Sequence, residues 1–338
     1  MPLLAAYFDS SSVSFLIKKD KKSVELLNFP YVYSKGILSN QCTEQQFYDF
    51  LITKILTDRR INISKCDILT SGLIYSPTLS IPTKFSVGVS DLIQNSDDFT
   101  PVAAGDFYFL SKNLLSSFSY CNEGDIVSKG DEVGQLNYYS NMCIYPQIVS
   151  NDFSKQSDID EKILEKMPKD FKLEPGKILF TGGRFSQRIL SEELSYVLIL
   201  GMLKEYGIYE VYIDRNNVFS LSQMVKMYDK NSVFSIEDYI EKSGLFIRTG
   251  GSVECLLSSG VGDDQFIEIE KDKVFLMPLN LSGNAKLSLK SNALGSIDVK
   301  TNGGEVGIVF DTRVGNESLY KDVKLFNNCV KQFERSPR

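Results

Sequence analysis

Short apolar runs separated by polar turns open the chain and predict a β-hairpin followed by a further strand. Leu3 to Phe8 is a continuous apolar run, and Val13 to Ile17 resumes one after the polar bend Asp9 to Ser12. Runs of this length bounded by turn residues are typical of strands. Asp67 to Thr70 is another such run, and it ends at Ser71-Gly72, where glycine allows a sharp turn.

A helix is expected between the hairpin and the third of these strands. Thr43 and Gln46 have the spacing of a capping box, in which each side chain caps the backbone of the other residue. Apolar residues then recur at helical spacing, which predicts that one face is buried. These residues are Phe47, Phe50, Leu51 and Ile55.

The same alternation of strands and helices returns in the second half of the chain. Lys177 to Phe180 predicts a strand that runs into Thr181-Gly182-Gly183, and Ser191 can cap the helix that follows. Tyr209 to Ile213 predicts a strand that ends at Asp214. Strands alternating with helices indicate an α/β sheet.

Two short strings suggest an internal duplication of this α/β unit. They are Ile68 to Gly72 and Leu179 to Gly183, each an apolar strand that ends in threonine followed by a glycine-containing turn. Two strings this short prove little, and taken alone they are better explained by coincidence.

Beyond Leu245, apolar and polar residues alternate with a period of two, which is typical of antiparallel strands with one buried face. The alternating runs are Phe266 to Glu270, Ala285 to Lys290 and Ile297 to Lys300, and a glycine turn precedes Val306 to Phe310. Helical spacing returns from Leu319 to Phe333. We therefore expect an α/β half over 1–150 with a β-rich hairpin insert, a second α/β half over 151–244, and an antiparallel β module with a terminal helix over 245–338.

Composition removes several classes of function. The 338 residues carry a net charge of −6, which does not favour a nucleic-acid-binding surface. The chain has no histidine, so Ser-His-Asp hydrolysis, Cys-His proteolysis and His-ligated zinc are excluded. Six scattered cysteines without a C-x-x-C pair argue against a tetrathiolate zinc site and favour reduced thiols.

No segment of the sequence predicts membrane insertion or export. The N-terminus lacks a basic region and reaches Asp9 before a signal-peptide core can form. The longest aliphatic stretch, Val197 to Leu203, is far below the roughly 20 residues that a transmembrane helix needs. We therefore expect a cytoplasmic protein with no transmembrane segment.

The bend Asp9-Ser10-Ser11-Ser12 is the first candidate site. A polar hairpin between strands can bind phosphate, because backbone N–H groups converge there and serine hydroxyls add donors. Asp9 can hold a magnesium ion, which prefers one or two carboxylates together with phosphate oxygens. The alternative is a solvated hairpin that is merely rich in serine.

The turn Thr181-Gly182-Gly183 is the second candidate site. Paired glycines after a strand allow the backbone to approach a ligand such as a base or ribose. A tight strand-to-helix turn explains the same glycines equally well. Asp214 to Asn217 also follows a predicted strand, and either a ligand or a salt-bridged turn accounts for it.

Three stretches of the second half occur together in a recognisable order. Lys177 to Phe185 combines a strand with a double-glycine turn, Tyr206 to Arg215 is an apolar strand ending in Asp-Arg, and Gly303 to Arg313 follows the β-rich region. Together they resemble the glutamate mutase L family, accessory proteins associated with a coenzyme-B12-dependent mutase and related to the actin, sugar-kinase and Hsp70 superfamily. The resemblance extends from about Asn137 to Arg313.

The resemblance implies an actin-like (ribonuclease H-like) mixed sheet with helices and a nucleotide site. Tyr7 to Ser12 stands in place of the superfamily's first phosphate hairpin, so the resemblance makes Asp9 the magnesium-side carboxylate and Ser10, Ser11 and Ser12 donors to phosphate. Thr181, Gly182 and Gly183 would lie against adenosine. Ser10 stands where the superfamily has glycine. The second phosphate hairpin of the superfamily, Asp-x-Gly-x-Thr, is missing, and Ala104 to Phe107 near its place has a different order.

The missing hairpin leads to three hypotheses. The first is an actin-like accessory or scaffold protein with a degenerate nucleotide site, weak or no ATPase activity and protein partners. The second is a Mg-ATP-dependent ATPase that reactivates a B12-dependent mutase. The third is an assembly platform similar to the actin-like component of pilus machines. ATP and magnesium are the cofactors in the second hypothesis, and none is required in the others.

Overall fold

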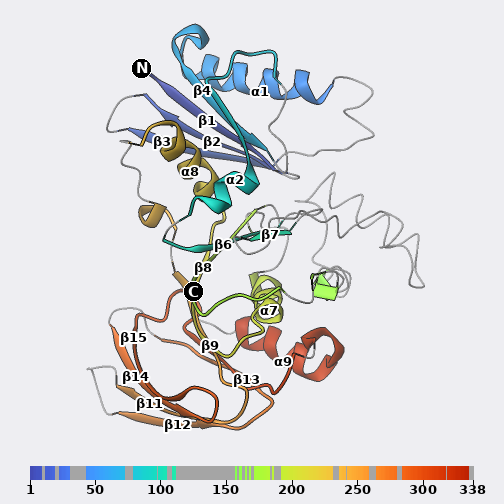
Figure 1. The fold of residues 1–338 in the computed structure, drawn as a ribbon, viewed down its shortest axis with the longest axis vertical. Helices are drawn as coiled ribbons and strands as arrows, with labels where there is room; N and C mark the ends of the chain where they lie inside the picture. Colours follow the sequence, from blue (N-terminus) through green and yellow to red (C-terminus); the bar gives the residue numbers. More distant parts are fainter. Residues whose placement is uncertain are drawn as a thin grey trace, which may run out of the picture.

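The computed structural model contains three β-sheets with helices packed between and around them (Figure 1). It describes residues 1–9, 12–19, 23–30, 43–72, 79–96, 98–104, 109–111, single positions between 157 and 168, 171–182, 185, 192–230, 236–240, 242–258, 264–279, 284–316 and 318–334. The β-rich hairpin insert, which is expected from Glu123 to Val133, lies outside these residues, as does Ser191.

The first sheet has five strands in the order β3-β2-β1-β4-β5. The hairpin β1–β2 and the pair β2–β3 are antiparallel, whereas β1–β4 and β4–β5 are parallel. The predicted strands are confirmed, and β3 and β5 are additional. Their bounds are β1 Leu3–Phe8, β2 Ser12–Lys18, β3 Val24–Pro30, β4 Asp67–Gly72 and β5 Phe85–Gly88.

Helix α1 (Glu44–Asp58) covers one face of this sheet, and its capping box is confirmed. The Thr43 Oγ1 accepts from the N–H of Gln46 at 3.2 Å, and the Gln46 Oε1 accepts from the N–H of Thr43 at 2.9 Å. The predicted buried face is wrong in part, because Phe50 is 60% exposed. The helix turns a neighbouring stripe toward the sheet, formed by Tyr48, Ile52, Ile55 and Leu56.

The second sheet has seven strands in the order β13-β16-β10-β9-β8-β6-β7. Pairs β6–β8, β8–β9 and β10–β16 are parallel, and pairs β6–β7, β9–β10 and β13–β16 are antiparallel. The bounds are β6 Thr100–Ala104, β7 Phe109–Ser111, β8 Gly176–Thr181, β9 Gly207–Ile213, β10 Lys242–Arg248, β13 Val274–Met277 and β16 Ile308–Asp311.

The two sheets share a repeated strand order. In the first sheet the hairpin β1–β2 is followed by the parallel neighbours β4 and β5, and in the second the hairpin β6–β7 is followed by the parallel neighbours β8 and β9. The similar strings Ile68 to Gly72 and Leu179 to Gly183 end the equivalent strands β4 and β8. This correspondence favours duplication over coincidence.

Helices separate the two sheets and cover the outer face of the second. Residues from α2 (Val89–Gln94) and α8 (Val218–Tyr228) share one apolar core with strands of both sheets, and Figure 1 shows them between the sheets. On the opposite face of the second sheet, α7 (Glu192–Met202) and α9 (Val323–Glu334) form another core. The 3₁₀ turns are Ile63–Lys65, Ile236–Asp238 and Leu319–Lys321.

The third sheet is antiparallel, in the order β12-β11-β14-β15. Its strands are β11 Val253–Ser258, β12 Gln265–Ile269, β14 Ala285–Ser291 and β15 Gly295–Thr301. One face packs on β10, β13 and β16 through apolar side chains that include Cys255, Leu287 and Phe310. The strand expected to continue this antiparallel region, β16, instead joins the second sheet, where β10 pairs with it in parallel.

These observations confirm the expected fold class. The protein is mixed α/β with two mixed sheets that resemble the actin-like fold, and it has a C-terminal antiparallel four-stranded sheet. The proposed domain boundaries stay a prediction, although β6 and β7, which precede residue 150, pair within the second sheet. In the described part of the chain, no helix is both long and apolar enough to cross a membrane.

Candidate functional site

The first candidate site lies at the end of the β1–β2 hairpin. The N–H of Asp9 donates to the carbonyl oxygen of Ser12 at 2.8 Å and closes the hairpin, and both residues are buried. Ser14, two residues along β2, is buried as well. Because side chains alternate along a strand, Ser12 and Ser14 lie on the same face of the sheet as Leu16, which packs toward α8.

The second candidate site is connected to this region by the turn Asp214 to Asn217, which leads from β9 into α8. The Asp214 carboxyl accepts from the N–H groups of Asn216 (3.2 Å), Val218 (2.9 Å) and Phe219 (2.8 Å). It also accepts from the Thr181 hydroxyl at 3.1 Å. Asp214 therefore caps α8 and fixes the end of β8 at the same time.

Burial and hydrogen bonding change the pKa of Asp214 in opposite directions. Complete burial raises the pKa of Asp214 above its usual range, because the charged form is desolvated. The hydrogen bonds from Phe219, Val218, Thr181 and Asn216 act in the opposite direction without cancelling that effect. A helix N-terminus also favours a negative charge.

Asn217 connects the turn to the serine hairpin. Its Nδ2 donates to the Ser12 hydroxyl at 3.3 Å and to the Ser14 hydroxyl at 3.1 Å, and all three side chains are buried. The backbone of Asn217 is left-handed, with φ 54°, a conformation that asparagine tolerates better than most residues. This conformation directs the Asn217 side chain away from the usual capping position, which Asp214 fills.

The turn Asp214 to Asn217 thus contacts both candidate sites, because Asn217 bonds to Ser12 and Asp214 bonds to Thr181. Gly182 follows Thr181 with φ 94°, so the turn requires glycine for its geometry. Asp9 is buried beside Ser12 at the hairpin end. Ser10, Ser11 and Gly183 lie outside the described residues.

Gly303 to Arg313, the third stretch of the family resemblance, also contacts the turn Asp214 to Asn217. Arg215 Nη2 donates to the Glu305 carboxylate at 3.1 Å, and the Tyr196 hydroxyl donates to the same carboxylate at 3.2 Å. A Cβ at Gly304, where φ is 71°, would lie 2.6 Å from the carbonyl oxygen of Lys242, so only glycine fits. The salt-bridged turn weighed for Asp214 to Asn217 is therefore present.

Sequence reasoning missed α8 and the roles of Asn217 and Glu305. The signal for α8 was present, because Val218, Leu221 and Val225 recur at helical spacing after an Asp-x-x-Asn turn. No sequence pattern marks Asn217 as a partner of serines about two hundred positions earlier. That contact depends on α8 packing across the first sheet.

Some buried polar atoms near this network lack a hydrogen-bond partner among the described residues. They are the Ser71 Oγ at the end of β4, the Asn217 Oδ1, and the Ser220 Oγ in the first turn of α8. A buried polar group without a partner is costly, so each is a candidate contact for water or a ligand.

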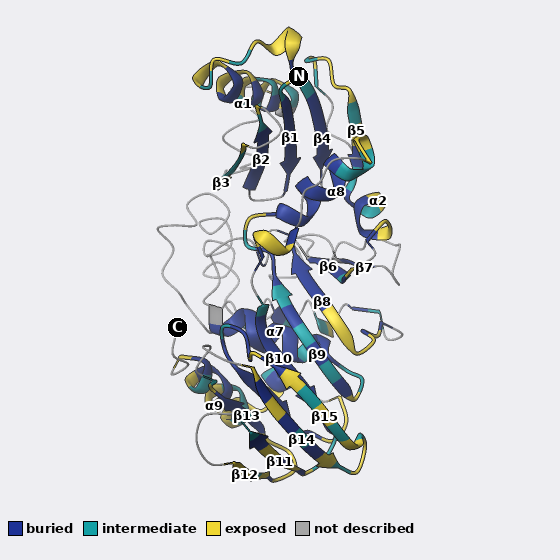
Figure 2. Cartoon of the chain, turned by 90° about the vertical axis from the view of Figure 1, so that its left-hand side faces the viewer, coloured by how far each residue is buried: buried dark blue, intermediate teal, exposed yellow. Residues whose placement is uncertain are grey.

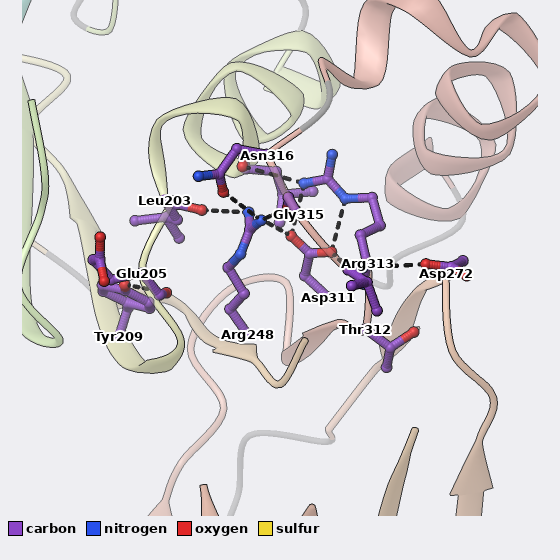
Figure 3. A network of polar contacts seen from close by, with 12 residues as sticks. Leu203, Glu205, Tyr209, Arg248, Asp272, Asp311, Thr312, Arg313, Gly315 and Asn316 are labelled. Carbon is purple, nitrogen blue, oxygen red and sulfur yellow. Dashed lines mark hydrogen bonds and ion pairs between the residues drawn. The ribbon is translucent and has the colours of Figure 1, made fainter. Parts of the chain in front are cut away.

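A second polar network surrounds the last three residues of the third stretch (Figure 3). Arg313 forms two hydrogen bonds to Asp311, from Nε at 2.8 Å and Nη2 at 2.7 Å, and Arg248 Nη1 donates to Asp311 at 3.3 Å. Arg248 also donates to the carbonyl oxygens of Leu203 at 2.6 Å and Gly315 and to the Asn316 side chain at 2.9 Å. Arg248, Asp311 and Arg313, which we call the arginine–aspartate triad, are all buried.

This triad has a structural explanation. Arg248 and Arg313 donate to the carbonyls of Leu203 and Leu200, at the C-terminal end of α7. Cations stabilise that end of a helix, where the macrodipole is negative. Burial lowers the pKa of Arg248, and the neighbouring Asp311 opposes that change. The motif therefore fixes α7 to β10 and β16.

The cysteines and acidic residues that the structure describes give no further candidate. Cys66, Cys255 and Cys329 are buried free thiols, and burial raises their pKa to about 11, 11 and 12 respectively. Cys42, Cys121 and Cys143 lie outside the described residues. Within the described ranges, no three His, Cys, Asp or Glu side chains are grouped so as to hold a metal ion.

Comparison with known proteins gives a distant structural likeness only. No family model matches the sequence, and no curated protein matches it. The structure is similar to the PPX-GPPA enzyme of Aquifex aeolicus, with a TM-score of 0.27 and 11% identity over 55% of this chain and 69% of that one. Two further structures from this organism are a Ppx/GppA family member (TM-score 0.25, 10% identity, 55% and 67% covered) and a type II Ppx/GppA phosphatase variant (0.24, 12%, 55% and 69%).

Likenesses at this level carry no argument about activity, and they point to no specific family. The class defined by fold and site is a mixed α/β protein of two mixed sheets with a polar network between them. The resemblance to the glutamate mutase L family stays a prediction.

Proposed function

We propose that this chain is an actin-like accessory or scaffold protein whose nucleotide site is degenerate and which acts through protein partners. The observation that supports this proposal is the engagement of Ser12 and Ser14 by Asn217. A phosphate that used the Ser12 hydroxyl would have to displace an internal hydrogen bond. The resemblance to the glutamate mutase L family favours a mutase as the partner.

Two further features support weak or absent ATP turnover. Phosphoryl transfer depends almost entirely on positioning and electrostatic stabilisation around the phosphate. The sequence lacks the second hairpin carboxylate, and Asp214 is already used by α8 and Thr181. Of the two hairpin carboxylates that the superfamily uses around magnesium and phosphate, Asp9 is then the one that remains as a candidate.

A Mg-ATPase that reactivates a mutase is the second candidate. It is favoured by the buried atoms Ser71 Oγ, Asn217 Oδ1 and Ser220 Oγ, which have no partner among the described residues and border the network. In that function Asp9 would hold magnesium through water, Ser12 would donate to phosphate, and Thr181 and Gly182 would lie against adenosine.

Thermal unfolding with and without MgATP separates these functions. A ligand at a hundred times its dissociation constant stabilises a protein by about 2.7 kcal/mol. We expect little or no shift for the wild-type chain at millimolar MgATP. We expect a larger shift for Asn217→Gly, which frees the Ser12 hydroxyl and suits the left-handed backbone.

Controls define the opposite result. MgAMP, which lacks the β- and γ-phosphates, tests the phosphate contribution to the thermal shift. ATP with a chelator tests the contribution of magnesium. A wild-type shift that disappears in Asp9→Ala, together with phosphate release, would replace the scaffold proposal by the ATPase. Asp58→Ala is the matched carboxylate control, because Asp58 is exposed at the end of α1 and pairs with the exposed Lys54.

A further inference from the structure

The free edges of the three sheets are treated differently. At the β13 edge, the Gln332 side chain takes the place of another strand, because its Oε1 accepts from the N–H of Leu276 at 2.7 Å and its Nε2 donates to the carbonyl of Val274 at 2.9 Å. The β3 edge ends at Pro30, which cannot donate to a neighbouring strand. Such devices prevent unwanted strand pairing.

Among the described residues, the β15 edge has neither a proline nor a side chain bonded to its free backbone groups. Strand β15 pairs with β14 on one side only, and Figure 2 shows it on the side facing the viewer. Ser296, Asp298 and Lys300 are exposed on its outer face. On the inner face Ile297 and Val299 are only half-buried, although Val299 packs against the core between the second and third sheets.

On the outer face of β15, Asp298 has ion-pair and hydrogen-bond partners, whereas Lys300 has no acidic partner among the described residues. Asp298 has two partners on β14, the Lys286 ammonium at 2.8 Å and the Ser288 hydroxyl at 2.7 Å. Lys300 lies directly opposite Lys286, and it forms no ion pair with any described residue. Like charges opposite one another destabilise a strand pair, so Lys300 lacks a compensating acid.

We propose that β15 pairs antiparallel with β15 of a second copy of this chain, about a two-fold axis through Val299. In this register each Asp298 lies opposite the partner subunit's Lys300, and each Lys300 opposite the partner subunit's Asp298. The two Val299 side chains meet on the inner face and extend the apolar layer. The two four-stranded sheets become one continuous sheet of eight strands.

Charge complementarity selects this register and this strand. A two-fold axis through Asp298 or through Lys300 would place identical charges opposite each other. Axes through Ile297 or Thr301 would pair the charged residues with neutral ones only. The other edge of this sheet, β12, is less suitable, because its Glu268 already lies opposite Glu254 and would lie opposite itself in the register centred there.

The size of the contact sets the expected affinity. One strand of seven residues buries less than the roughly 1,200 Å² of a standard interface, so the dimer is expected to be weak and concentration-dependent. The proposal does not depend on nucleotide binding or on the function of the Asp214 network.

Sedimentation velocity of the full chain over a concentration series tests the proposal. We expect a reversible monomer–dimer equilibrium for the wild type. Lys300→Glu should weaken association by about tenfold or more, because both cross-strand pairs become repulsive. Asp298→Lys should do the same with the opposite sign of charge.

Mixing Lys300→Glu with Asp298→Lys is the decisive experiment. Lys300→Glu presents only acids and Asp298→Lys only lysines, so an equimolar mixture should form heterodimers while each alone stays largely monomeric. Lys300→Glu also places an acid opposite Lys286, so its thermal stability should not fall, and a thermal melt of both variants verifies folding. The double variant Asp298→Lys/Lys300→Glu should restore the homodimer.

Several outcomes would overturn the proposal. A wild-type chain that is monomeric at every concentration has no such interface. A dimer that persists in Lys300→Glu, or folded variants that do not associate when mixed, would place the contact elsewhere.

Discussion

Two buried polar networks close the ends of two helices in opposite ways. At the N-terminal end of α8, the single carboxyl of Asp214 receives N–H groups and the Thr181 hydroxyl. At the C-terminal end of α7, two guanidinium groups donate to helix carbonyls and share Asp311. Both arrangements agree with the helix dipole.

The two networks differ in how many of their buried polar atoms have a hydrogen-bond partner. Around Asp311, the only buried orphan among the described residues is the Arg248 Nε. Around Asp214, the Asn217 Oδ1 and the neighbouring Ser220 Oγ have no partner among those residues. The difference teaches that an acidic residue within a family-like motif can be purely structural, whereas orphaned polar atoms indicate where a ligand or water can bind.

Removing the acid from the α7 network should have the largest effect on stability. Asp311→Ala leaves Arg248 and Arg313 buried without their counter-ion, and we expect a loss of about 4 kcal/mol in the free energy of unfolding. Urea denaturation measures it. Glu254→Ala is the matched control, because Glu254 pairs with Lys290 on an exposed surface at 3.6 Å and should change little. A small effect of Asp311→Ala would mean that the triad is not a structural unit.

An intermediate effect is expected at the α8 network. Asp214→Asn keeps the shape but loses one acceptor among buried donors, which should cost about 2 kcal/mol. Because burial raises the pKa of Asp214, the folded state binds a proton more tightly than the unfolded chain does. The contribution of Asp214 is therefore fully present below the ordinary Asp pKa and decreases as pH rises through the raised value.

The cost of Asp214→Asn should accordingly be larger near pH 4 than near pH 7. Denaturation of both proteins at the two pH values gives this difference directly. Asp91→Asn, in the first turn of α2, is a control outside the network. A cost that instead grows toward neutral pH would show that the hydrogen bonds outweigh burial and that the pKa is lowered.

The smallest effect is expected at Asn217, where side chain and backbone can be separated. Asn217→Gly removes the hydrogen bonds to Ser12 and Ser14 but suits the left-handed backbone, so we expect a loss of about 1 kcal/mol. Asn217→Ala should lose about 1 kcal/mol more, because alanine disfavours that conformation. Thermal melts of the pair provide the comparison. Equal stabilities of the two variants would remove the backbone contribution from this explanation.

Much of the fold could be predicted from local pattern. The hairpin β1–β2, the strands β4, β8 and β9, and the capping box of α1 follow from apolar runs, turn residues and the Thr43–Gln46 spacing, all of which act within a few residues. The buried face of α1 could not be predicted as well. Phe50 belongs to an apolar stripe in sequence but lies beside the stripe that the sheet covers.

The candidate site could be predicted only in pieces. The Asp9 to Ser12 bend and the Thr181-Gly182 turn each have a local signal, and so does the Asp-Arg ending of β9. Their connection through Asn217 does not, because it depends on α8 lying across the first sheet. The orphaned atoms that border the network are visible only once both partners of every hydrogen bond are placed.

The sequence by itself determined the local elements, the α/β class and the absence of histidine chemistry, because these depend on composition and on spacings of a few residues. The tertiary structure decided which motifs are joined. It placed Asp214 between α8 and β8, Asn217 against Ser12 and Ser14, and Asp311 between two arginines. Burial, helix ends and long-range hydrogen bonds arise only when distant segments pack, and they separate a structural acid from a candidate binding residue.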